Sequence, residues 1–276
     1  MTDRTVAIAA APNGARLTRK DHPAIPISPA EVAACARECL AEGAAMIHVH
    51  ARAADDTHTL DPGRMAAVRD SVRDAVGDGL VLQLTTEAIG IYEPPAQMEL
   101  VRATRPEAAS FAIRELAPDA TNEKPFGDLL GWMRGEGMHA QFILYDLADL
   151  RRLIDLRERG VVPWASPSVL VVLGRYVPGG AWSAASLGPY LDPMAAAGIT
   201  DWMVCAFGRE ASAASAAALA LGGGTRVGLE NSTVDADDRQ VAGNAALVAH
   251  AAGLARAIGR RPLTGPELRA RWRALD

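Results

Sequence analysis

The sequence predicts a (β/α)8 barrel, the TIM-barrel fold of the α/β class. Eight short apolar segments alternate with longer segments of helical character along nearly all of the 276 residues. The apolar segments lack the alternation of a half-exposed strand, so each strand should be buried on both faces, as in a parallel sheet covered by helices. Eight strand–helix units in a chain of this length fit a closed barrel better than an open doubly wound sheet.

The predicted strands follow one another at intervals that leave room for a helix between them. They cover residues 5–11, 44–51, 80–86, 107–113, 139–145, 168–174, 201–208 and 225–230. Their length and their bounding turn residues are typical of the buried strands of a parallel sheet.

The first predicted helix has the clearest start. Ser28, Pro29 and Glu31 supply an N-cap, a proline in the first turn and the acid of a capping box. Further helices are predicted at 62–76, 96–103, 123–136, 147–160, 183–197, 211–221 and 240–258.

The end of the chain predicts one more short helix after residue 262, with Thr264 and Glu267 as its capping pair. No long linker, low-complexity tract or compositional shift divides the chain. We therefore expect a single barrel domain over residues 1–276, with a short C-terminal helical extension.

Composition narrows the classes of function. The net charge is -5, from 28 basic and 33 acidic residues, and no basic stripe suggests a nucleic-acid partner. The sequence has no signal-peptide pattern and no apolar run long enough to span a membrane. The three cysteines, Cys35, Cys39 and Cys205, have no CxxC spacing, so reduced thiols and a cytoplasmic location are expected.

Polar residues collect where the predicted strands end, and barrel active sites lie at those ends. These residues are His48, His50, Thr85, Thr86, Glu87, Arg114, Glu115, Asp146, Glu230 and Asn231. Tyr145, Arg175 and Tyr176 also follow strands and could border an entrance for substrate, although Tyr145 with Asp146 could equally serve packing and a helix cap.

His48 and His50 point to one face of the second strand, because side chains two residues apart share a face. Two imidazoles and one carboxylate form a ligand set for a divalent metal with an open position, most commonly zinc. Glu230 is the candidate third ligand, since the eighth and second strands both flank the first in a closed barrel.

A structural interpretation stays open beside the metal site. His48 and His50 could be satisfied by hydrogen bonds, with Arg52 paired to Asp55 or Asp56. An amidohydrolase is a weaker interpretation, because that class places its HxH pair on the first barrel strand and needs later histidines that this chain lacks.

Six segments together resemble the β-keto acid cleavage enzymes, whose founding member acts on 3-keto-5-aminohexanoate. They are residues 10–33, 43–52 ("GAAMIHVHAR"), 82–88 ("LQLTTEA"), 170–174, 204–209 ("VCAFGR") and 219–231 ("LALGGGTRVGLEN"). The resemblance runs from residue 6 to about residue 268, in the order of the family's motifs.

The resemblance implies a TIM barrel, a bound zinc and an acyl exchange in which a β-keto acid and acetyl-CoA give acetoacetate and a new acyl-CoA. It also implies a homo-oligomer. The implied zinc ligands are His48, His50 and Glu230; Arg226 would lie beside the reacting carbon, and Thr85 and Thr86 would hold the substrate carboxylate.

Five positions depart from the founding type. Asn231 replaces an aspartate that partners Arg226, which leaves the catalytic base open. Glu87 replaces a glycine, Arg114 and Glu115 replace small polar residues, and Arg16 replaces a glutamate. We hypothesise that Arg16 pairs with Glu115, or receives an anionic or neutral polar substrate tail. A hydrolase or lyase that acts without CoA, and a metal-binding barrel without turnover, remain alternative functions.

Overall fold

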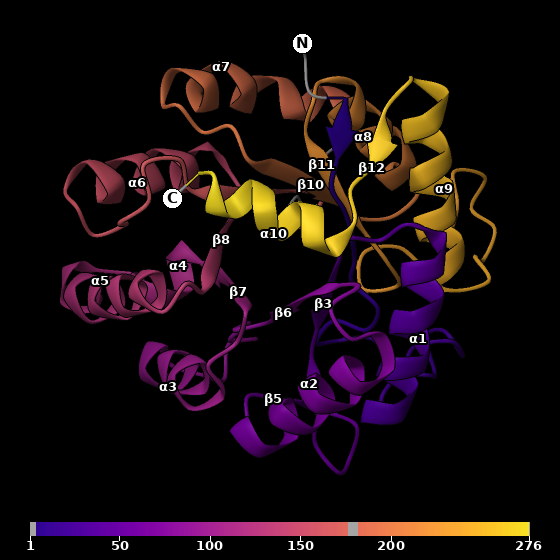
Figure 1. The fold of residues 1–276 in the computed structure, drawn as a ribbon, viewed down its shortest axis with the longest axis horizontal. Helices are drawn as coiled ribbons and strands as arrows, with labels where there is room; N and C mark the ends of the chain where they lie inside the picture. The colour runs from indigo at the N-terminus through magenta and orange to yellow at the C-terminus, as the bar shows by residue number, and fades with distance from the viewer. Residues whose placement is uncertain (1–3, 176–181, 276) are drawn as a thin grey trace.

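A computed structural model describes residues 4–175 and 182–275, and it confirms the predicted (β/α)8 barrel. Eight parallel strands close on themselves in the order β10-β11-β2-β3-β6-β7-β8-β9, and helices surround them (Figure 1). The barrel strands are β2 (Ile8–Ala10), β3 (Met46–Val49), β6 (Val81–Leu84), β7 (Ala108–Ala112), β8 (His139–Leu144), β9 (Ser168–Leu173), β10 (Trp202–Ala206) and β11 (Gly224–Val227).

The helices lie close to the predicted positions. They are α1 (Pro29–Glu42), α2 (Pro62–Val76), α3 (Pro94–Thr104), α4 (Ile113–Leu116), α5 (Ala120–Gly135), α6 (Leu147–Glu158), α7 (Gly188–Ala196), α8 (Ala211–Ala220), α9 (Asn244–Ala257) and α10 (Gly265–Arg273). A 3-10 turn, Ala184–Leu187, precedes α7, and the short α4 was not predicted. Both predicted capping boxes form, at Ser28 with Glu31 and at Thr264 with Glu267.

Two predicted strands are each broken in two. The strand predicted at 5–11 divides into β1 (Thr5–Val6), which pairs with β12 (Arg261–Pro262), and the barrel strand β2. The strand predicted at 44–51 divides at His50 into β3 and β4 (Ala51–Arg52), which pairs with β5 (His58–Thr59).

The break at His50 has a local cause. The Asn13 side chain donates to the backbone oxygen of His50 at 3.0 Å and accepts from its backbone nitrogen at 3.3 Å. Because one side-chain amide satisfies both backbone groups of this buried residue, His50 needs no partner from a neighbouring strand.

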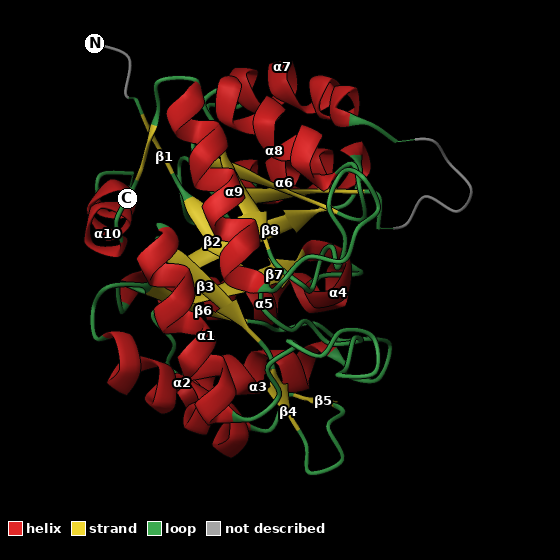
Figure 2. Ribbon diagram, turned by 90° about the vertical axis from the view of Figure 1, so that its right-hand side faces the viewer, coloured by secondary structure: helices red, strands yellow, loops and turns green. Residues whose placement is uncertain are grey.

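Helix α10 covers the N-terminal end of the barrel. Leu268 and Trp272 pack with the inward residues of the strands, and the Trp272 ring stacks on His139 with ring centroids 3.6 Å apart. In Figure 2, α10 lies at the left and long loops gather on the opposite side. His139 therefore lies at the end away from the polar strand ends, as its place at the start of a strand predicts.

Three further expectations from the sequence concern membrane-spanning helices, the cysteines and Tyr176. No helix among the described residues is long and apolar enough to span a membrane. Cys35, Cys39 and Cys205 are free thiols and buried. Tyr176 lies outside the described residues, so the structure does not place it.

Candidate metal centre and active site

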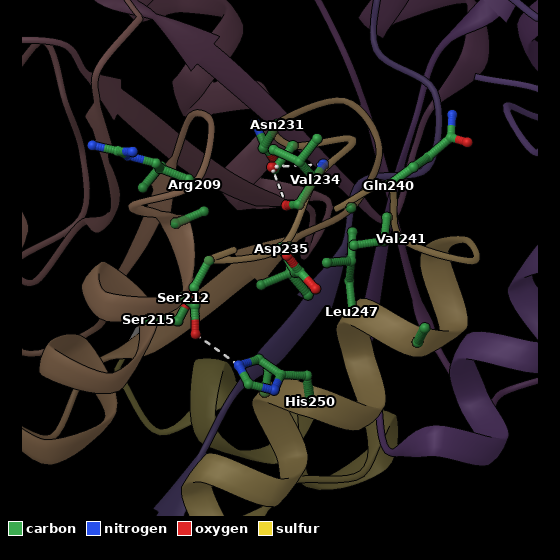
Figure 3. Close-up of a pocket in the computed structure, with 18 of the residues that line it drawn as sticks. Arg209, Ser212, Ser215, Asn231, Val234, Asp235, Gln240, Val241, Leu247 and His250 are labelled. Carbon is green, nitrogen blue, oxygen red and sulfur yellow. Dashed lines mark hydrogen bonds between the residues drawn. The ribbon is translucent and has the colours of Figure 1, made fainter. Parts of the chain in front are cut away.

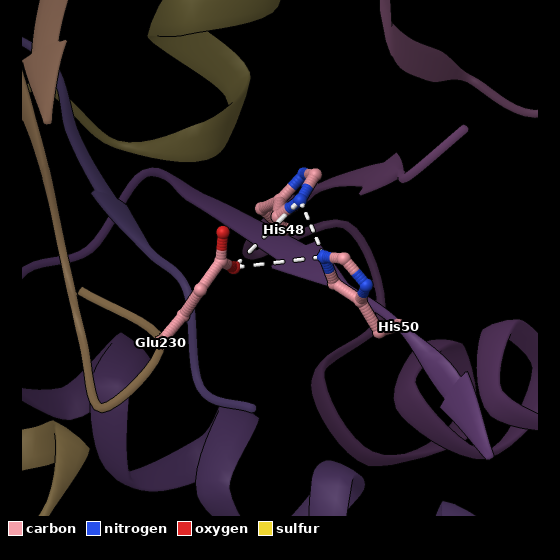
Figure 4. A group of neighbouring side chains, drawn as sticks. All are labelled: His48, His50 and Glu230. Carbon is pink, nitrogen blue, oxygen red and sulfur yellow. Dashed lines mark hydrogen bonds and ion pairs between the residues drawn. The ribbon is translucent and has the colours of Figure 1, made fainter. Parts of the chain in front are cut away.

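His48 and His50 reach the barrel interior because of strand alternation. Met46 packs inside the barrel and Ile47 packs against the outer helices, so His48 turns inward again. His50 continues in the same direction just beyond β3. Glu230, from the loop after β11, faces both imidazoles (Figure 4).

The three side chains converge on one small volume. The Nε2 atoms of His48 and His50 lie 3.1 Å apart. Glu230 Oε2 lies 3.9 Å from His48 Nε2 and 3.6 Å from His50 Nε2. One ligand atom from each residue lies within 4.8 Å of the others, which is close enough for one cation to touch all three.

Neighbouring side chains determine where the His48 proton lies. The strand register places Gln83 beside His48. Gln83 donates through Nε2 to Gln141 at 3.1 Å, so its Oε1 faces His48 Nδ1 at 2.9 Å. An amide oxygen only accepts, which means that His48 carries its proton on Nδ1 and keeps a lone pair on Nε2.

The same argument applies to His50. His58 Nε2 lies 3.0 Å from the backbone oxygen of Glu87 and must donate to it. Neutral His58 then has a lone pair on Nδ1, which lies 3.4 Å from His50 Nδ1. His50 therefore donates through Nδ1, and its Nε2 also presents a lone pair.

Two imidazole lone pairs and a carboxylate oxygen thus face one another with no proton between them. Among the described residues, Glu230 Oε2 has no hydrogen-bond partner although it is buried. Burial lowers the pKa of His48 to about 4 and that of His50 well below its usual value, so both rings are neutral at pH 7. This donor set fits a divalent cation such as zinc.

Two glycines allow Glu230 to reach this position. Gly228 has φ +153°, and a Cβ there would lie 2.1 Å from the backbone oxygen of Ala11. A Cβ on Gly14, at φ +55°, would lie 2.5 Å from Glu230 Cγ. Arg226 then fixes the carboxylate by donating from Nη2 to Oε1 at 2.9 Å. The remaining oxygen, Oε2, points toward the imidazoles.

Arg52 holds the loop that contains Gly14. Its Nη2 donates to three backbone oxygens, those of Asn13 at 2.9 Å, Gly14 at 2.6 Å and Leu17 at 2.9 Å. The ion pair of Arg52 with Asp55 or Asp56, raised as an alternative, does not form within the described part of the chain. Its Nη1 donates instead to the backbone oxygen of Asp56 at 3.1 Å.

Arg226, Cys205 and Asn231 form a buried polar group beside Glu230. The Cys205 sulfur lies 3.6 Å from Arg226 Nη2 and 3.5 Å from Asn231 Nδ2. Burial raises the pKa of the Cys205 thiol, so the sulfur is protonated at pH 7. Arg226 Nε and Nη1 and Asn231 Oδ1 are buried and have no hydrogen-bond partner among the residues described.

A small cavity of about 190 Å³ adjoins this group, and we call it the small cavity. Arg16, Arg175, Phe207, Glu230 and Asn231 are among its lining residues. The Arg175 guanidinium lies 4.8 Å from the centre of the Phe207 ring.

The Glu87 carboxylate lies close to Arg16 and Arg175, the two arginines that line the small cavity. Its Oε1 is 3.6 Å from Arg175 Nη2 and 4.0 Å from Arg16 Nε. Burial, followed by the negative charge of Glu230, raises the pKa of Glu87 to about 7, against the opposing effect of Arg175.

The hypothesised pair of Arg16 with Glu115 is not observed within 4 Å in the described residues. Glu115 Oε2 accepts instead from the backbone nitrogen of Ala88 at 3.0 Å and from Gln97 Nε2 at 3.1 Å. These two donors engage the Glu115 carboxylate, and among the described residues Glu87 is the one acid whose carboxylate lies within 4.0 Å of Arg16.

Thr85 and Thr86 are both buried but differ in the use of their hydroxyls. Thr86 donates to the backbone oxygen of Ser110 at 2.7 Å, so its proton is engaged inside the protein. Thr85 Oγ1 accepts from the backbone nitrogen of Glu87 at 3.0 Å. That bond uses only a lone pair, and the Thr85 proton can be donated to a ligand.

The polar residues after β7 and β8 form a separate network. Arg114 donates to Asp146 and Asp149 at 2.7 Å each, and its guanidinium lies 4.9 Å from the centre of the Tyr145 ring. Asp146 also caps α6. These contacts support the structural interpretation of Tyr145 and Asp146.

A larger groove of about 510 Å³ lies between α8 and α9, and we call it the α8–α9 groove (Figure 3). Its walls are largely apolar, and Ser212 Oγ lies 2.7 Å from His250 Nε2 across it. The α8–α9 groove and the small cavity share Asn231, Ser232 and Val234. A ligand in the groove can therefore approach the residues beside Glu230.

Two residues that position the site, Asn13 and Gln83, are not predicted from the sequence pattern. Gln83 has a signal, because it is the one strongly polar residue within the apolar run "LVLQL" and so had to find a buried partner. Asn13 precedes a glycine and has the pattern of an ordinary turn, which gives no indication of its contact with His50.

The fold and the side-chain cluster define a (β/α)8-barrel protein with a candidate metal centre at the carboxyl ends of its strands. Residues 5–273 match the beta-keto acid cleavage enzyme family. The chain therefore belongs to that family. The predicted resemblance is confirmed, and with it the class of carbon–carbon-cleaving acyltransferases.

Individual relatives agree with the family match. The chain is 26% identical to a 3-keto-5-aminohexanoate cleavage enzyme of Fusobacterium nucleatum, covering 95% of each chain. It is 26% identical to a 3-oxoadipate:acetyl-CoA acetyltransferase of Cupriavidus necator, covering 95% of this chain and 93% of the relative. The solved structure of ObcA shares the fold at a TM-score of 0.72 and 16% identity, covering 90% of this chain and 65% of ObcA.

We expect the substitution His48→Ala to abolish stoichiometric zinc binding, because it removes one of two imidazole donors. The affinity should fall by more than about 100-fold, since even residues that only orient ligands are worth 10–100-fold. Elemental analysis after dialysis measures the zinc content. The control variant His250→Ala, which changes an exposed histidine of α9, should retain zinc. Full zinc occupancy in His48→Ala would contradict the ligand assignment.

Proposed function

We propose that this protein is a zinc-dependent β-keto acid cleavage enzyme in which His48, His50 and Glu230 bind the zinc. The observation that carries the proposal is the pair of Nε2 atoms 3.1 Å apart, on rings whose Nδ1 atoms are engaged, beside a carboxylate oxygen that has no hydrogen-bond partner among the described residues. Burying these atoms together without a cation is unfavourable. Zinc bound there would act as a Lewis acid toward the oxygens of a β-keto acid.

The proposed reaction exchanges acyl groups between two substrates. A β-keto acid and acetyl-CoA give acetoacetate and the CoA ester of the remaining acyl fragment. Family membership supports this reaction, and the Cupriavidus necator relative is itself named as an acetyltransferase that uses acetyl-CoA. A cytoplasmic location and a homo-oligomer, without nucleic-acid or membrane partners, complete the proposal.

The free polar atoms near Glu230 suggest how substrate is held. Arg226 can donate through Nε and Nη1 to negative charge that develops beside the reacting carbon, and Asn231 can accept through Oδ1. Thr85 has a proton to donate to the substrate carboxylate, whereas Thr86 positions the same loop through Ser110.

Arg16 and Arg175 determine the charge that a substrate tail meets in the small cavity. A cationic tail would have to enter beside two guanidinium groups, and Glu87 is the nearest carboxylate to offset them. We therefore propose that the substrate has an anionic or neutral polar tail. Glu87 and Glu115 would border the substrate-binding loop on the other side. The amine-bearing 3-keto-5-aminohexanoate fits this cavity poorly.

The α8–α9 groove is the proposed approach for acetyl-CoA. It meets the small cavity at Asn231, and its largely apolar lining suits a neutral, extended chain such as the pantetheine arm. Its polar side chains, including Ser212 and Gln240, can hydrogen-bond the amides of that arm.

Two other functions would use the same metal centre. A hydrolase or lyase would cleave the β-keto acid without CoA. A barrel that binds metal without turnover would also be compatible with Asn231 in place of an acid. The requirement for acetyl-CoA separates these possibilities from the proposed function.

We expect zinc-loaded protein, screened with a panel of β-keto acids, to release acetoacetate only when acetyl-CoA is present. Cleavage at the same rate without acetyl-CoA would indicate a hydrolase or lyase. Bound zinc with no cleavage of any panel member would indicate the inactive barrel. Acetoacetate is measured by a coupled reductase assay, with His48→Ala as the control for background.

The position of Arg16 predicts which substrate tails the enzyme prefers. In the same panel, kcat/KM should be highest for anionic or neutral polar tails and lower for amine-bearing tails. Arg16→Glu should shift the ratio of kcat/KM values toward the amine-bearing tail by about 10-fold or more, because it replaces a repulsive charge with an attractive one. If the amine-bearing substrate were cleaved by the native protein as fast as any other, the assignment of Arg16 would be wrong.

Narrowing the α8–α9 groove should affect acetyl-CoA alone. Ala246 is exposed on α9 and lines the groove, so Ala246→Trp should raise KM for acetyl-CoA by about 10-fold while zinc content and KM for the β-keto acid change little. The matched control is Ala213→Trp, on the exposed face of α8 outside the groove. Equal effects of the two variants would place acetyl-CoA elsewhere.

A further inference from the structure

The proposed reaction needs a base, and the residues beside Glu230 do not provide one. Removing a proton from C2 of a β-keto acid requires a group that accepts a proton near neutral pH. The amide of Asn231 does not accept one, and the guanidinium of Arg226 stays protonated beside Glu230. The identity of the base is an inference that rests on the proposed function.

Most other titratable groups at this end of the barrel are already engaged. His48 and His50 direct their lone pairs toward the metal position, and Glu230 is shared between that position and Arg226. The Cys205 thiol is protonated and 1% exposed. The Glu115 carboxylate is held by two N–H donors.

Glu87 differs from all of these. Its two ion pairs, at 3.6 Å to Arg175 and 4.0 Å to Arg16, are both longer than a hydrogen bond, so the carboxylate keeps lone pairs for a proton. Both arginines line the small cavity together with Glu230. Glu87 is not itself among the lining residues, but its contacts with these two arginines place it beside the small cavity, and 18% of its side chain is exposed.

The backbone of Glu87 is fixed relative to the metal position. Its nitrogen donates to Thr85 Oγ1 and its oxygen accepts from His58 Nε2, each at 3.0 Å. His58 in turn accepts from His50. One histidine therefore links the Glu87 loop to a proposed zinc ligand, and this keeps the carboxylate at a constant place beside the site.

Charged groups from five segments act on the Glu87 carboxylate. Arg16 comes from the loop after β2, Arg52 from β4 and Arg175 from the loop after β9. Glu115 belongs to α4, and Glu230 follows β11. Burial and the two glutamates favour the protonated form, and the arginines favour the carboxylate. The resulting pKa of about 7 is close to the value that suits a general base at neutral pH.

We propose that the Glu87 carboxylate is the general base that removes the C2 proton of the β-keto acid. The C2–H bond breaks, its electron pair remains on the substrate as an enolate, and the proton passes to Glu87. The enolate carbon then attacks the acetyl-CoA carbonyl, a new carbon–carbon bond forms, and the CoA thiolate leaves. The thiolate attacks the C3 carbonyl of the original β-keto acid, the C2–C3 bond breaks, and the original acyl fragment departs as its CoA ester. The electron pair of the broken bond stays on C2 as the enolate of acetoacetate, to which Glu87 returns the proton, so no proton is gained or lost overall.

The test compares Glu87→Gln with Glu93→Gln, which makes the same chemical change at an exposed position six residues away. In zinc-loaded protein, Glu87→Gln should lower kcat by about 10²–10⁴-fold. The rate at which the C2 protons exchange with D2O, measured by NMR in the absence of acetyl-CoA, should fall by the same factor. Zinc content and the Kd of the β-keto acid, measured by calorimetry, should stay within about 2-fold.

The pH profile provides a further readout. Protonation of Glu87 removes the base, so kcat/KM of the native protein should fall as the pH drops through the pKa of Glu87. Bound zinc adds positive charge nearby, and this limb should therefore lie at or below pH 7. The residual rate of Glu87→Gln should lack the limb.

Three outcomes would separate the hypotheses. Exchange at the native rate in Glu87→Gln, or loss of zinc or substrate affinity in parallel with the rate, would overturn the base assignment. If Glu87→Gln fails to fold, Glu87→Ala replaces it, and added formate should then restore exchange; no restoration would count against the base. Native protein that neither exchanges nor cleaves any β-keto acid would instead contradict the proposed function.

Discussion

A buried imidazole that donates one proton to a fixed acceptor has only one lone pair left, and the direction of that lone pair is then fixed by the ring. In this barrel Gln83 accepts a hydrogen bond from His48 Nδ1, and His58 accepts one from His50 Nδ1. Both lone pairs consequently point at Glu230. The other features at the carboxyl ends of the strands follow from this arrangement, because they either hold the acceptors or bring the carboxylate into place.

The loop after β2 connects these parts. Asn13 completes the backbone bonds of His50, Gly14 makes room for Glu230, and Arg52 binds the loop through three carbonyl oxygens. Arg16, in the same loop, borders the small cavity. The proposed substrate recognition and the proposed metal coordination therefore both depend on one short segment, and a change in its backbone would affect both.

The barrel was predictable from the sequence because local apolar segments indicate both the number of strands and their burial. The inward direction of His48 and His50 followed from the same periodicity. The break at His50 was not predictable, since it depends on an amide that is distant in sequence. The pairing of Arg16 also depends on loops that meet only in the fold, and so the structure brings it to Glu87 rather than to Glu115.

The ion pair between Arg226 and Glu230 also bears on how the protein matures. With both imidazoles neutral, one guanidinium and one carboxylate balance each other, and these four side chains together carry no net charge. In the proposed zinc enzyme, the ion would then not be needed to balance buried charge during folding, unlike the ion of a zinc finger, which itself drives folding. Metal loading would be a late step of assembly, selected by the geometry of the two imidazole lone pairs and not by long-range attraction.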